Sequence, residues 1–78
     1  MPRYYFDVCD GGRFIPDDEG FELDGPQVAE RMAMTAAADM ARDSLPKGDT
    51  DGVAVEVHDG SGKRVLTVTV AMRVERAV

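Results

Sequence analysis

The stretch DGPQVAERMAMTAAADMARDSL, residues 24–45, decides the fold because its apolar residues recur at helical spacing. At about 100° per residue, one broad arc carries the apolar side chains, and polar and charged residues lie opposite. The apolar arc consists of Ala29, Met32, Ala33, Ala36, Ala37 and Met40. We predict an amphipathic helix from about residue 25 to 44, capped by Asp24, with Pro26 in its first turn and its end before Pro46.

Segments of alternating apolar and polar residues flank this helix on both sides, at the period of two that is typical of half-buried strands. Glycine-containing turns at residues 10–12 and 59–62 close two hairpins, and residues 48–52 form a loop by composition. The predicted strands are residues 3–9, 13–15, 53–58 and 64–74, with residues 21–23 as an extended piece that continues the second strand after a bulge.

The resulting order, ββαββ, predicts one small α+β domain over residues 1–78. A four-stranded, mainly antiparallel sheet with the helix packed on one face is the simplest arrangement that buries both apolar surfaces. The predicted core consists of Tyr4, Phe6, Val8, Ile15, Leu23, Met32, Ala36, Met40, Val55, Val57, Leu66, Val68 and Val70.

Composition excludes several classes of function. Fifteen acidic residues against nine basic ones give a formal net charge of -6, which repels phosphate backbones and anionic lipid surfaces. The single cysteine, Cys9, excludes an intrachain disulfide and a cysteine-based zinc site, and it fits a reducing compartment. Because the chain shows neither a signal core nor a run of about 20 apolar residues, we expect a soluble cytoplasmic protein that binds neither nucleic acid nor membrane.

A family resemblance rests on several short motifs together. They are the opening Pro2-Arg3-Tyr4-Tyr5-Phe6, the Asp10-Gly11 turn, the Asp17-x-Glu19-Gly20-x-Glu22-Leu23 stretch, the alanine-rich helix, and residues 52–59 followed by Val65-Leu66-Thr67-Val68. In these features the chain resembles a family of short uncharacterised proteins, a domain of unknown function common in rhizobia and related alphaproteobacteria. The resemblance implies a fold and a bacterial setting but no activity. Many members have His where this chain has Asp7.

Two groups of residues carry chemistry in principle. Five carboxylates fall within eight residues, at Asp17, Asp18, Glu19, Glu22 and Asp24, but their spacing matches no calcium-binding loop, and we interpret them as an acidic turn and a helix cap. Asp49, Asp51 and Asp59 are interpreted as turn residues. His58, beside Asp59, shares the outward strand phase with Cys9, so a Cys–His pair is conceivable, yet nothing in the sequence activates the thiol. We therefore assign no catalytic residue, no metal ligand and no cofactor.

The more informative feature is apolar surface without an obvious cover. A second helical stripe lies beside the main arc, and the sheet face turned away from the helix is apolar for a fully wet surface. The candidate interaction residues are Met34, Ala38, Ala41 and Leu45 on the helix and Tyr5, Val65, Thr67 and Thr69 on the sheet. Two alternatives are that the tail from Met72 covers one of these surfaces, or that they are the ordinary exposed apolar area of a small domain.

The sequence thus favours a non-enzymatic interaction module that associates with itself, as a two-fold dimer, or with an unidentified protein partner. An antitoxin-like regulator is a second hypothesis, based on fold analogy alone. A minimal enzyme built around His58 and Cys9 is a third.

Overall fold

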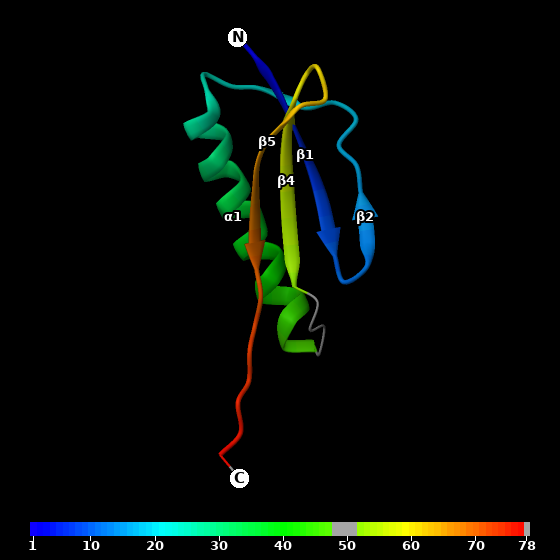
Figure 1. Ribbon diagram of the computed structural model, residues 1–78, viewed down its shortest axis with the longest axis vertical. Helices are drawn as coiled ribbons and strands as arrows, with labels where there is room; N and C mark the ends of the chain where they lie inside the picture. The colour runs from blue at the N-terminus through cyan, green and yellow to red at the C-terminus, as the bar shows by residue number, and fades with distance from the viewer. Residues whose placement is uncertain (48–51, 78) are drawn as a thin grey trace.

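In the computed structural model, which describes residues 1–47 and 52–77, one helix packs against one face of an antiparallel sheet (Figure 1). The elements are β1 (Arg3–Asp10), β2 (Arg13–Ile15), β3 (Phe21–Glu22), α1 (Pro26–Ser44), the short 3-10 helix η1 (Leu45–Lys47), β4 (Val53–Asp59) and β5 (Arg64–Val70). The α+β class is confirmed. Most of the predicted 48–52 loop, with Asp49 and Asp51, lies outside the described residues.

The sheet has five strands rather than the predicted four. Its order is β2-β1-β4-β5, and β3 pairs with the same side of β1 as β2 does, opposite β4. The two short strands share that side because β2 pairs with residues 8–10 of β1 and β3 with residues 3–4. Pro16 and the acidic turn separate them. Residues 21–22 are thus a strand of their own, and not a continuation of the second strand.

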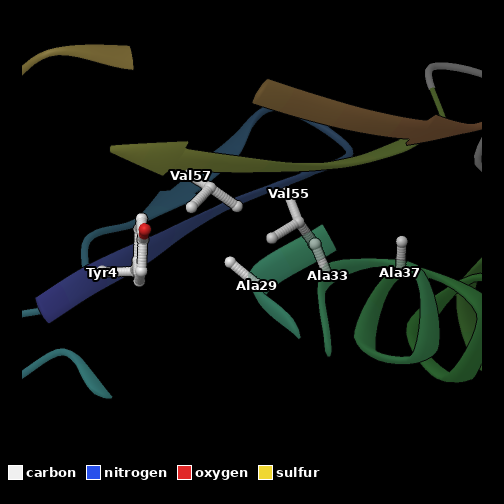
Figure 2. Packing of buried hydrophobic residues seen from close by; sticks show 6 residues of the cluster. All are labelled: Tyr4, Ala29, Ala33, Ala37, Val55 and Val57. Atoms are coloured by element: carbon white, nitrogen blue, oxygen red, sulfur yellow. The ribbon is translucent and has the colours of Figure 1, made fainter. Parts of the chain in front are cut away.

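The core forms where α1 crosses β4 and β5. Val53, Val55 and Val57 of β4 are fully buried, since β4 has a strand on each side and the helix above it. Figure 2 shows the facing surface of α1, in which alanines spaced by four residues lie toward the valines. The fully buried helix residues are Ala29, Ala33 and Ala37. These small side chains keep the helix close to the sheet, and the predicted core residues Met32, Ala36 and Met40 lie half-buried along its margin.

Two predictions about burial are wrong. Ile15, predicted to be core, is 46% exposed, because α1 packs mainly on β4 and β5 whereas β2 lies at the far edge of the sheet. Ala41 and Leu45, predicted to lie on an open stripe, are each 6% exposed and pack against Val53 and Val70. The open part of that stripe is therefore shorter than predicted.

Both ends of the helix differ in detail from the prediction. Gly25, not Asp24, is the N-cap residue, and no side chain caps the first turn, whereas Pro26 occupies the first helical position as predicted. The C-terminal end continues into η1. The helix, the only one of more than one turn in the described chain, does not combine the length and apolarity that a membrane-crossing helix requires.

The last strand is shorter than the pattern predicts. Alternation runs to Val74, but β5 ends at Val70, which pairs with Val53, the first residue of β4. Beyond that point the described chain offers β5 no partner strand, so residues 71–77 run past the end of the sheet with exposed side chains (Figure 1).

Candidate functional site

The polar side chains of β1 and β4 gather on the sheet face opposite α1. Because side chains alternate along a strand and the register pairs Tyr5 with His58 and Asp7 with Glu56, these four residues share that face. We call it the open face. Together with Arg64, three of them line a shallow hollow of about 400 Å³.

His58 is held on three sides. Its Nε2 lies 3.1 Å from the Asp7 carboxylate, its Nδ1 lies 3.2 Å from the carbonyl oxygen of Asp59, and its ring stacks on Tyr5 at a centroid distance of 5.2 Å. Both ring nitrogens thus face oxygen acceptors, an arrangement in which the imidazolium form donates two hydrogen bonds. A general base needs a free nitrogen lone pair directed at a substrate, so this geometry favours a structural role for His58.

Asp7 also anchors the acidic turn. Its second oxygen accepts a hydrogen bond from the backbone N–H of Asp17 at 2.9 Å. Asp17 in turn accepts hydrogen bonds from the backbone N–H groups of Phe6, Glu19 and Gly20, each at 3.1 Å. Desolvation alone would raise the pKa of Asp17, but the three N–H donors, with His58 nearby, hold it below its ordinary value.

The acidic turn is therefore organised around one carboxylate that binds backbone. Both oxygens of Asp17 already accept hydrogen bonds, which leaves this side chain poorly placed as a cation ligand. Over residues 1–47 and 52–77, no group of three or more acidic, histidine or cysteine side chains has the geometry to hold a metal ion.

Cys9 is placed away from His58. In the pairing of β1 with β4, Cys9 lies opposite Ala54, and His58 lies opposite Tyr5. Cys9 and His58 are therefore four residue positions apart along the strands, about 13 Å. The Cys9 Sγ instead lies 3.6 Å from a Glu56 oxygen. Desolvation, followed by the hydrogen bond and negative charge of Glu56, raises the pKa of this thiol, which is the opposite of what a nucleophilic cysteine requires.

Glu56 links the thiol to the last strand. Its other oxygen lies 2.7 Å from a guanidinium nitrogen of Arg64, so Cys9, Glu56 and Arg64 form a row across β1, β4 and β5. Asp7 contacts His58 in the same hollow, and Glu56 contacts Arg64, so each of these four side chains has another of them as its partner. The arrangement ties three strands together and leaves the polar side chains of the hollow in contact with one another.

The structure separates the candidate interaction residues into four sets. Met34 and Ala38 remain exposed on the helix, whereas Ala41 and Leu45 belong to the core. Tyr5 is half-buried against His58. Val65, Thr67 and Thr69 are all exposed along β5, at the border of the sheet.

Two features of the open face escaped the sequence analysis. The pairing of Asp7 with His58 depends on the register of β1 against β4, and the only sequence signal was their common outward phase. The role of Asp17 was signalled by Asp-x-x-Gly, a typical turn in which an aspartate side chain accepts hydrogen bonds from the residues that follow.

Comparison with known proteins adds a family. No curated protein and no solved structure matches the chain. The domain of unknown function DUF6894 matches residues 3–71, a span that begins with β1 and ends one residue beyond β5. This chain therefore belongs to the DUF6894 family.

Proposed function

We propose that this chain is a non-enzymatic interaction module that associates with a second copy of itself. The observation that carries the proposal is the outer edge of β5, which has no strand beside it in the described structure. The eight residues from Val65 to Met72 carry no charge. Natural sheets usually protect such edges with charges, proline or a covering segment, because an open edge pairs readily with another strand.

The opposite edge of the same sheet supports this reading by contrast. There β2 and β3 have only three and two residues, Pro16 follows β2 directly, and Arg13 and Glu22 place charges on the short strands. The edge formed by β2 and β3 thus carries the usual protection against pairing with another strand. The β5 edge has only a shift in register near its start, between Arg64 and Leu66. This difference favours a pairing role for β5.

The polar cluster favours a structural role over catalysis. Cys9 has a raised pKa and lies apart from His58, and His58 has an acceptor at each ring nitrogen. A Cys–His enzyme needs a thiol of lowered pKa with an imidazole beside it. We therefore place the function at the surface of the protein and not in the hollow of the open face.

The setting that fits this function is the cytoplasm of an alphaproteobacterium. The proposal rests on the resemblance to rhizobial proteins and on the single cysteine, whose thiol is free.

Sedimentation equilibrium at tens of micromolar protein tests self-association. We expect a species of twice the 8.5 kDa chain mass. The double variant Val65→Lys/Thr67→Lys should be monomeric because it places two ammonium groups on the pairing strand. Met34→Lys, on the exposed helix stripe, is the matched control and should remain dimeric. A wild-type chain that sediments as a single 8.5 kDa species would overturn the proposal.

A further inference from the structure

We infer that two copies join edge to edge through β5, antiparallel, with a two-fold axis that passes through Val68. This inference rests on the proposed self-association and adds to it the surface and the register. The two chains would then form one continuous sheet, ordered β2-β1-β4-β5-β5-β4-β1-β2. Because this axis is perpendicular to the sheet, both helices would cover the same face.

Backbone hydrogen bonds identify which groups of β5 point outward. The N–H of Asp59 donates to the carbonyl of Lys63, so the backbone of Asp59 is directed toward β5. Backbone groups alternate sides along an antiparallel strand, which directs those of Val57, Val55 and Val53 the same way. Their partners Leu66, Val68 and Val70 therefore bond inward to β4.

An independent contact on β1 agrees with this assignment. The N–H of Phe6 donates to the Asp17 carboxylate and not to β4. Phe6 pairs with Val57, so the Val57 backbone is directed away from β1, toward β5. The alternation then leaves Thr67 and Thr69 as the residues of β5 whose N–H and C=O groups point outward. The register shift interrupts the alternation at Val65, and β5 ends at Val70.

The distribution of these outward residues selects the register. The two outward residues Thr67 and Thr69 are symmetric about Val68, so an axis there pairs Thr67 with Thr69 of the second copy. Both outward residues are then paired at the centre of the uncharged stretch.

Neighbouring registers are less favourable. An axis at Thr69 places Val65 opposite Arg73 of the second copy, and an axis at Thr67 places Ala71 opposite Lys63. With the axis at Val68, the facing rows are uncharged on both sides of the sheet. They consist of Leu66, Val68 and Val70 on the helix side and of Thr67 and Thr69 on the open face.

Charge at the two ends of the stretch does not oppose this pairing. Arg64 is bound to Glu56 at 2.7 Å, and Arg73 is bound to Glu75, so the basic residues that bracket the stretch are neutralised within each chain. The interface itself contains none of the acidic residues responsible for the net charge of -6.

Disulfide trapping tests the register. In a Cys9→Ser background, which removes the only native thiol, we would prepare Thr67→Cys and Thr69→Cys separately and oxidise each alone and as an equal mixture. Facing residues in an antiparallel pair have Cα atoms about 4.5 to 5.5 Å apart, within disulfide reach. Thr67 lies about 9 Å from its own copy in the proposed register, beyond the limit of roughly 7 Å.

We therefore expect a cross-linked dimer in the mixture and in neither variant alone. Thr35→Cys, an exposed threonine on the helix, reports cross-linking by random collision. If Thr67→Cys or Thr69→Cys links by itself, the axis lies at that residue and the inferred register is wrong. If the wild type is dimeric but the mixture stays unlinked, the β5 edge is not the interface. A monomeric wild type would instead remove the proposed function itself.

Discussion

Truncation of Val55 to alanine should measure how much of the stability resides in β4. Val55 is fully buried, pairs with Val8 and Val68 on its two sides, and packs in the cluster that includes Ala33 (Figure 2). Loss of two buried methyl groups costs about 1.6 kcal/mol at roughly 0.8 kcal/mol each. A residual cavity of about 40 Å³ adds about 1 kcal/mol, so the expected loss in unfolding free energy is roughly 2.5 kcal/mol.

Urea unfolding at a fixed protein concentration is the assay, because self-association would make stability concentration-dependent. With an m-value of about 1.2 kcal/mol per molar, the loss corresponds to a midpoint about 2 M lower. Val74→Ala is the matched control, since the same truncation at a residue that is 75% exposed beyond the end of β5 should shift the midpoint far less. Equal shifts for both variants would refute the assignment of β4 as the centre of the core.

Three further predictions concern the turns and the open face. Gly20→Ala should lower the unfolding free energy more than Gly12→Ala does. Both glycines have positive φ, but a Cβ at Gly20 would lie 2.9 Å from a backbone oxygen, whereas a Cβ at Gly12 would have no atom within 4 Å. The urea midpoints of the two variants test this difference. The pKa of Asp17 is lower in the folded protein than its unfolded value, taken as 3.8. The ionised carboxylate therefore stabilises the fold above pH 3.8, and this stabilisation is lost as pH falls through the folded pKa. Asp17→Asn should make the unfolding free energy less dependent on pH in this acidic range, as urea midpoints measured at several pH values would show. Cys9 should alkylate slowly below pH 9.0, its reference pKa, and Glu56→Gln should speed alkylation by removing a neighbouring negative charge; equal rates for the two proteins would contradict the assigned contact.

Local pattern was sufficient to predict the helix and the longer strands. The helix bounds follow from Pro26 and from the proline at position 46, two residues with fixed backbone preferences. Burial was predicted less well. Ala41 and Leu45 were placed on an open stripe because a helical wheel gives angles but not the width of the surface that covers them. Here η1 extends the contact past the end of α1.

The open face shows where sequence reasoning stops. Asp59 is next to His58 in the sequence, but its carboxylate accepts hydrogen bonds from Ser61 and Lys63 in the hairpin turn, as predicted for a turn residue. The carboxylate that contacts the His58 ring belongs to Asp7 on another strand. A shift of one residue in the register of β1 would turn Asp7 to the other face of the sheet. Only the assembled sheet therefore identifies the pair.

The last strand ends earlier in the structure than the sequence pattern predicts, and the proposed dimer gives a reason for this difference. Alternation in the sequence continues to Val74, four residues beyond the last residue that β4 pairs. A strand pattern reflects every partner available to a segment, whereas a single chain contains only its internal partners. With an axis at Val68, Ala71 would lie opposite Val65 of the second copy and Met72 opposite Arg64, so pairing would extend two residues past Val70. The alternating residues directly after Val70 would then be residues that pair with the second chain.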